Sequence, residues 1–190
     1  MANRSDAISA SWGALCAIAC AALSALAAPA GAAVVHASAS GFELKQVVHI
    51  AAPPARVYAA LIQPAKWWNA QHTYSGVAAN LSLDARIGGC FCEALPGGGA
   101  VEHLRVVSLL PNAALELRGA LGPFHSRGVD GVLAFSLAAA GDGVDLTMTN
   151  DLGGYMSEGM DVWAPRADAM LADQLARLKR YVETGAPGPS

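Results

Sequence analysis

The sequence predicts an α+β fold: a curved antiparallel sheet wrapped around a long C-terminal helix, with two short helices after the first strand. Between residues 81 and 152, apolar and polar residues alternate in runs that are separated by Gly- and Pro-containing clusters, which is typical of antiparallel strands joined by turns. Between residues 160 and 183, apolar residues recur every three or four positions, which predicts a helix with one buried face. A helix of about 20 residues is about 30 Å long and can cross a whole sheet.

The remaining elements follow from local signals. Residues 42–50 alternate loosely and predict the first strand, which Pro53 and Pro54 end. A short helix is expected over residues 55–62 because proline suits the first helical turn, and a second helical turn is expected over 64–69. Since Pro165 is unfavourable beyond a first turn, the regular part of the last helix should begin near Ala164. We therefore place one domain at residues 42–184, followed by a Gly/Pro tail at 185–190 that needs no structure.

The first 37 residues have the layout of a secretory signal. Arg4 precedes an almost uncharged, Ala-rich run that ends at Pro29 and Gly31, and small residues then offer cleavage sites. These sites follow Ala32, Ala37 and Ala39, so cleavage is expected somewhere in 32–39. The mature protein would be periplasmic or secreted. The alternative is an uncleaved membrane anchor, because the run approaches the length of a membrane span.

Composition excludes several classes of partner. The 190-residue chain is 54% hydrophobic and 14% charged, with a formal net charge of −3. Its Lys and Arg residues are scattered without a run, so no basic surface for nucleic acid or for an anionic membrane is expected. The sequence contains no seryl-hydrolase, zinc-hydrolase or phosphate-binding motif, and we expect no cofactor.

Cys16 and Cys20 would leave with the signal, whereas Cys90 and Cys92 stay in the domain. Residues i and i+2 of a strand have Cα atoms roughly 6.5–7 Å apart, at the limit for a disulfide. Two buried thiols are therefore expected, and a strained bridge is the alternative. A metal site formed with His103 is a weaker alternative because no fourth ligand is evident.

A pocket between sheet and helix would be lined by the side chains on the inner face. Strand alternation directs one polar residue, Asn150, inward at a strand end, where a solvated rim position is the simpler explanation. Trp67 and Trp68 would either close an apolar cavity or cap the core. The expected lining also includes side chains of the strands and the last helix, namely Phe91, Leu104, Leu117, Phe135, Met148, Trp163 and Met170.

Two carboxylates are candidates for the polar end of this pocket. If the hairpin turns at residues 96–99, Phe91 faces Leu104, and Glu93 faces Glu102 on the inner face. Like charges so placed repel unless one is protonated, bound or paired, so the pair could serve as acid and base or hold a polar head group. Alternatively, both glutamates are solvated or neutralised by arginine, or a one-residue shift of register places His103 opposite Glu93.

The order of these elements resembles the START/polyketide-cyclase (SRPBCC) superfamily, and within it the homologues of the C-terminal domain of the Hsp90 ATPase activator. The resemblance covers residues 42–184 and implies a helix-grip fold with a cavity for small, largely apolar molecules. It implies no shared catalytic residues. The matching segments are residues 52–61, Lys66-Trp67-Trp68, residues 85–89 with Phe91, residues 143–149 and residues 174–183.

Three functions are consistent with these observations. The leading hypothesis is an exported protein that binds a small apolar or amphipathic molecule in the cavity. The second is a cyclase, dehydratase or hydrolase that uses Glu93, Glu102 or His103 for proton transfer. The third is a protein-binding module in the style of a chaperone activator, which would require a cytosolic mature chain.

Overall fold

The structure, a computed structural model, describes residue 1 and residues 34–189. Most of the predicted signal lies outside the described residues. An eight-stranded antiparallel sheet has the order β1-β2-β8-β7-β6-β5-β4-β3. The strands are β1 (Val34–Ser38), β2 (Gly41–Ile50), β3 (Leu81–Leu83), β4 (Cys90–Ala94), β5 (Ala100–Leu110), β6 (Ala114–Gly119), β7 (Gly128–Ala140) and β8 (Gly143–Tyr155).

The helices occupy the predicted places. The helix α1 (Pro54–Leu61) follows β2, and α2 (Ala164–Thr184) ends the domain. Pro165 lies in the first turn of α2, where its missing N–H leaves no intrahelical bond unmade. Short 3-10 turns connect the strands, namely η1 (Pro64–Lys66), η2 (Ala70–His72), η3 (Ala78–Asn80), η4 (Pro96–Gly98) and η5 (Gly122–Phe124).

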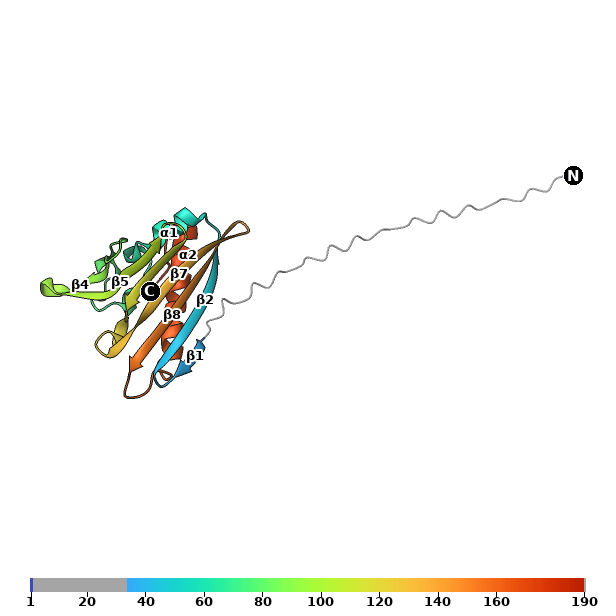
Figure 1. The fold of residues 1–190 in the computed structure, drawn as a ribbon. Coiled ribbons are helices and arrows are strands. Elements are labelled where there is room, and N and C mark those ends of the chain that lie inside the picture. The colour runs from blue at the N-terminus through green and yellow to red at the C-terminus, as the bar shows by residue number, and fades with distance from the viewer. Residues whose placement is uncertain (2–33, 190) are drawn as a thin grey trace.

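The sheet curves around α2, which crosses its concave face (Figure 1). The apolar stripe of α2 supplies Leu171, Leu175 and Leu178, each at most 4% exposed, and burial of a leucine side chain contributes roughly 1.5–3 kcal/mol. The strands supply the opposite wall of the core with inward residues such as Leu146 and Leu115. The predicted helix-grip α+β fold is therefore confirmed.

Strand β1 was not predicted. It pairs with β2 over Val34 to Ser38, with Ser38 opposite Gly41, and so forms one edge of the sheet before the predicted start of the domain at residue 42.

At the other end of the chain, the described part of the tail lies against α2. Arg177 donates from Nη1 to the carbonyl oxygen of Pro189 at 2.6 Å.

Neighbouring strands approach too closely at Gly131 for any residue with a side chain. At Gly131, β7 runs so near to β8 that a Cβ atom would overlap the carbonyl oxygen of Asp151.

Among the described residues, no helix is both long enough and apolar enough to cross a membrane.

Candidate functional site

The candidate site is a cavity of about 470 Å³ at the β3–β4 end of the sheet. Its walls come from the inner face of β4 and β5, from the two loops at residues 68–74 and 121–126, and from one side chain of α2. The lining is mainly apolar and aromatic, and includes Trp68, Tyr74, Phe91, His103, Leu121 and Met170.

A smaller cavity adjoins it. This space of about 210 Å³ is lined by Asn150 and Trp163, and it shares Leu121, Pro123 and Met170 with the first cavity. Asn150 is 6% exposed and donates from Nδ2 to the carbonyl oxygen of Val132 at 3.4 Å. The simpler explanation of Asn150, a solvated rim position, was therefore wrong.

A β-bulge changes the predicted register beside the main cavity. Phe91 faces Leu104 as predicted, but Cys92 then faces Glu102 and Glu93 faces Val101. His103 is the additional residue on β5, so His103 and Leu104 are both buried on the inner side. Bulges redirect single side chains in this way. The predicted opposition of Glu93 and Glu102 was wrong, and so was the alternative register that places His103 opposite Glu93, because Glu93 pairs with Val101. The side chains of His103 and Glu93 nevertheless meet on the inner side of the sheet.

Glu93 is completely buried, and its carboxylate is held by three donors. Its Oε1 accepts from the backbone N–H of Ser75 at 2.5 Å, and its Oε2 accepts from the backbone N–H of Tyr74 at 3.1 Å. The Nε2 atom of His103 lies 2.9 Å from the same Oε2. Burial acts to raise the pKa of Glu93, but the hydrogen bonds from Ser75, Tyr74 and His103 outweigh it and hold the pKa below its ordinary value. The carboxylate is thus the charged anchor of the loop at residues 74–75.

His103 is 6% exposed and lies between two aromatic rings. The ring of Tyr74 is stacked at a centroid distance of 5.7 Å, and the ring of Phe91 lies at 5.3 Å. Burial lowers the pKa of His103, although the hydrogen bond to Glu93 acts in the opposite direction. Its Nδ1 atom is buried and has no hydrogen-bond partner among the described residues.

Tyr74 also connects the two loops that line the cavity. Its hydroxyl donates to the carbonyl oxygen of Gly122 at 2.7 Å, while its backbone N–H is held by Glu93. Sequence analysis did not find this residue, because an irregular loop gives no periodicity from which its direction can be predicted.

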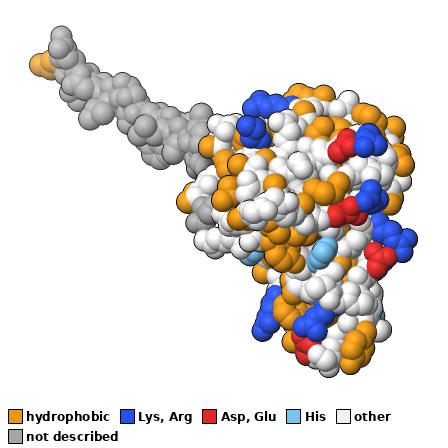
Figure 2. Space-filling view, turned by 90° about the vertical axis from the view of Figure 1, so that its left-hand side faces the viewer, with side chains coloured by type: hydrophobic (Ala, Val, Ile, Leu, Met, Phe, Trp, Pro, Cys, Tyr) orange, Lys and Arg blue, Asp and Glu red, His pale blue; other side chains and the backbone are white. Residues whose placement is uncertain are grey.

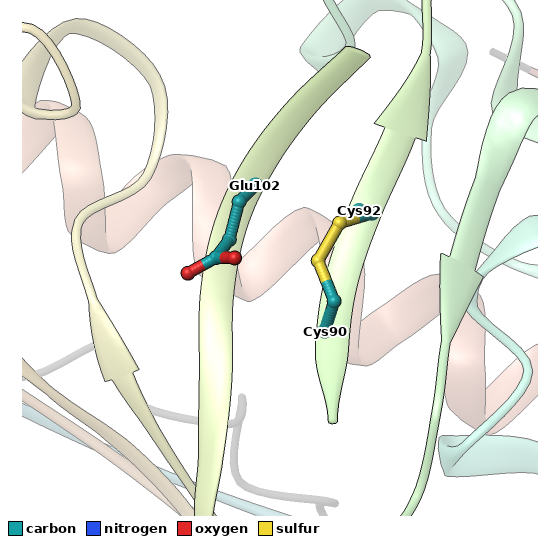
Figure 3. A group of neighbouring side chains, drawn as sticks. All are labelled: Cys90, Cys92 and Glu102. Atoms are coloured by element: carbon teal, nitrogen blue, oxygen red, sulfur yellow. A yellow bond between two sulfur atoms is a disulfide. The ribbon is translucent and has the colours of Figure 1, made fainter. Parts of the chain in front are cut away.

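The other predicted carboxylate lies outside the cavity. Glu102 is exposed and forms an ion pair with Arg105. Cys90 and Cys92 lie beside it on the face of the sheet away from α2, and their sulfurs are bonded to each other (Figure 3). The prediction of two free thiols was therefore wrong. Their Cα atoms are 5.3 Å apart, closer than in a regular strand and within the range of a disulfide.

Cys90, Cys92 and Glu102 are near enough to one another to share a metal ion. A thiolate is the form of cysteine that binds metal, and in the disulfide neither sulfur is a thiolate. His103, the third member of the metal alternative weighed from the sequence, faces the opposite side of the sheet.

Other predicted lining residues belong to the core. Trp67, Leu117 and Phe135 border a space of only about 20 Å³, while Leu104 and Met148 are 3% and 1% exposed. Trp67 donates from Nε1 to the carbonyl oxygen of Ala60 at 2.9 Å, so it caps the core. Trp68 borders the same small space but also lines the main cavity. The two neighbouring tryptophans thus have different roles.

A separate groove of about 640 Å³ lies on the side of the molecule between β2 and α2. Val47 and Leu175 border it together with the charged residues Lys179 and Glu183. Lys179 donates to the carbonyl oxygen of His49 at 2.7 Å, and Glu183 accepts from the backbone N–H of Ala51 at 2.9 Å. These polar groups are already satisfied, in contrast to His103.

The surface charges alternate in sign. On the face shown in Figure 2, Lys and Arg side chains lie beside Asp and Glu side chains, with hydrophobic groups between them. Among the ion pairs of the described residues, Arg118 lies 2.6 Å from Asp130. No large area of positive charge is visible on this face, in agreement with the scattered cations of the sequence.

No protein-family model matches the sequence, and no curated protein matches it. Solved structures do share its fold. A conserved protein of unknown function from Enterococcus faecalis superposes with a TM-score of 0.56 at 17% identity, covering 79% of this chain and 76% of the other.

Two further solved structures share the fold. The Aha1 dimer from Colwellia psychrerythraea matches with a TM-score of 0.53 at 19% identity, over 75% of this chain and 97% of that one. DynU16, a protein in the dynemicin biosynthetic locus, matches with a TM-score of 0.52 at 22% identity, over 76% of this chain and 48% of that one. The chain shares the helix-grip fold of these structures, which is the fold that the sequence resemblance implied. At identities of 17–22% the likeness concerns the fold alone.

Proposed function

We propose that this protein is exported and binds a small apolar or amphipathic molecule in the cavity bordered by Trp68, Phe91 and His103. The observation that carries the proposal is the cavity itself, whose volume of about 470 Å³ lies in the range of small-molecule sites. Its walls are largely apolar, and one buried polar pair, Glu93 with His103, stands at one side. This combination of an apolar lining and a few placed polar groups is typical of such sites.

Binding can be tested by native mass spectrometry of protein purified from its own host, followed by extraction of any bound molecule. A thermal-shift screen across lipids and metabolites extends the test to molecules lost during purification. We expect a co-purified molecule or a concentration-dependent rise in Tm. Empty protein in repeated preparations, together with no shift across the library, would contradict the proposal.

A matched pair of variants on α2 locates the binding site. Met170 borders both cavities, so Met170→Trp should fill the space and weaken binding at least tenfold. Ala169 is exposed on the same helix, so Ala169→Trp should leave binding unchanged. Equal affinities in the two variants would place the ligand elsewhere.

Export is the second part of the proposal, supported by the Ala-rich N-terminal run and its small-residue cleavage sites. N-terminal sequencing of the native protein tests it. A mature chain that starts between Ala33 and Ser40 is expected, and it would exclude the cytosolic protein-binding role in the style of a chaperone activator.

Proton-transfer catalysis is the second candidate function, and the hydrogen-bonded pair of His103 and Glu93 favours it. A histidine oriented by a carboxylate is a common general base. The version that requires two opposed carboxylates is not proposed, because Glu102 is on the outer surface. Turnover of a bound molecule that ceases in His103→Gln, with binding retained, would distinguish an enzyme from a carrier.

A further inference from the structure

Among the described residues, Arg166 is the only one with a permanently charged side chain that borders either of the two adjoining cavities. It lies in the first turn of α2, and its neighbours along the wall of the smaller cavity are mostly apolar, among them Phe124, Leu152 and Leu171. A few placed polar groups in an otherwise apolar lining determine how a ligand is oriented. The charge of Arg166 therefore bears on the head group of the molecule that these cavities take.

The ring of Trp163 holds the Arg166 guanidinium at the wall of the smaller cavity. The Cζ atom of Arg166 lies 5.3 Å from the centroid of this ring, a cation–π contact, and Trp163 itself borders the cavity. Arg166 is exposed, and so is His72, which borders both cavities. A head group at this surface can therefore reach the guanidinium while the rest of the molecule stays inside.

The charge of Arg166 is not neutralised within the described part of the chain, where it forms no ion pair. The acidic residue that shares its aromatic neighbour is Glu158, whose Oε1 accepts from the indole Nε1 of Trp163 at 2.9 Å. The Oε2 atom of Glu158 accepts from the hydroxyl of Ser157 at 2.6 Å. Both oxygens of Glu158 are thus engaged elsewhere, and the N–H donors of the guanidinium are left for a ligand. A guanidinium has five such donors and pairs with a carboxylate through two parallel hydrogen bonds.

The arrangement of the two cavities indicates the shape of the molecule. They meet at Leu121 and Met170, which border both. The smaller cavity lies on the side of Arg166, and the larger one leads to Trp68 and Phe91. A molecule with its head group at Arg166 must therefore be elongated to fill the larger cavity. It would pass Met170, whose unbranched side chain adapts readily to its neighbours.

We propose that the ligand is an elongated apolar carboxylate, with its carboxylate on the guanidinium of Arg166 and its apolar body passing Met170 into the larger cavity. This inference rests on the proposed function and adds the chemical class and the orientation of the molecule. A neutral alcohol of the same length keeps the apolar contacts but lacks the charge-assisted pair. A cation of the same length is repelled by Arg166.

A series of ligands with one chain length tests the proposal on the unmodified protein. Isothermal titration calorimetry at pH 7.5 would compare decanoate, decanol and decyltrimethylammonium below their micelle concentrations. Decanoate should bind about fivefold more tightly than decanol, which corresponds to a favourable exposed ion pair, and the cation should bind most weakly. The advantage of decanoate should shrink as salt is added, because salt screens exposed charges.

Two matched variants locate the head group. Arg166→Gln should bind decanoate and decanol alike, with the affinity for decanol unchanged. Arg127 is a second exposed arginine that borders neither cavity, so Arg127→Gln should keep the preference for decanoate. Arg166→Lys keeps the charge but loses the planar fork, so a reduced preference should remain. Circular dichroism would verify that each variant is folded before it is titrated.

The outcomes separate the inference from the proposed function. Equal affinity of the unmodified protein for decanoate and decanol would overturn the inference and leave the cavities as an apolar binding site. A preference for decanoate that survives in Arg166→Gln, or tightest binding of the cation, would overturn it as well. No binding of any of the three compounds, with no thermal shift across the wider library, would overturn the proposed function and the inference together.

Discussion

Removing the buried carboxylate of Glu93 should destabilise the protein by about 3 kcal/mol. Glu93→Ala leaves three donors without an acceptor, namely the backbone N–H groups of Tyr74 and Ser75 and the Nε2–H of His103. Each buried unpaired donor destabilises the folded state by roughly 1–3 kcal/mol. We use the lower figure of about 1 kcal/mol because both backbone groups are only partly buried and can gain water.

Urea denaturation at pH 7 measures the change in the free energy of unfolding. With a slope of roughly 1–3 kcal/mol per molar urea, the midpoint should fall by roughly 1–3 M. Amide hydrogen exchange should also accelerate at Tyr74 and Ser75, since the loop loses its anchor.

Glu102→Ala is the matched control on the next strand. Glu102 is exposed and its partner Arg105 is also exposed, so this substitution should change stability by less than about 1 kcal/mol. If Glu93→Ala were as mild as Glu102→Ala, with unchanged exchange at residues 74 and 75, the role assigned to the buried carboxylate would be refuted.

Three further predictions follow from the fold and the site. Because the pKa of His103 is lowered in the folded state, stability should fall as the pH drops below about 6.5, where the unfolded side chain takes up a proton. His103→Gln should remove this part of the pH dependence, and parallel wild-type and variant curves between pH 7 and 5 would contradict it. Gly131→Ala should lower Tm strongly because its Cβ would overlap backbone, whereas Gly128→Ala, with open space around it, should be mild; similar melting curves would refute the steric argument. Replacing Cys90 and Cys92 together by serine should lower the free energy of unfolding by only about 1–2 kcal/mol, because the disulfide closes a very short loop, and calorimetry showing a much larger loss would contradict this entropic reasoning.

Local sequence patterns were sufficient for the fold. Alternation along β7 and β8 and the three- and four-residue spacing in α2 report which face is buried, and burial of these faces determines how the layers pack. Pro53, Pro54 and Pro165 marked helix starts because their backbone chemistry restricts where they can occur.

The site was less predictable because it depends on departures from these patterns. One additional residue at His103 reverses the direction of every side chain before it in β5, which exchanges Glu102 for His103 on the inner face. The hydrogen bonds of Tyr74 and Ser75 to Glu93 arise in an irregular loop. Strand β1 was missed because its residues continue an Ala-rich segment that was interpreted as part of the signal.

The position of β1 bears on maturation of an exported chain. A signal peptidase that cuts after Ala32 would deliver β1 intact, whereas a cut after Ala37 or Ala39 would strip most of it from the partner residues 41–44 of β2. The unpaired backbone N–H and C=O groups of β2 would then form the edge of the sheet, where a strand from another molecule could pair with them. In an exported chain, the cleavage position would thereby decide whether β1 or β2 forms this edge of the sheet.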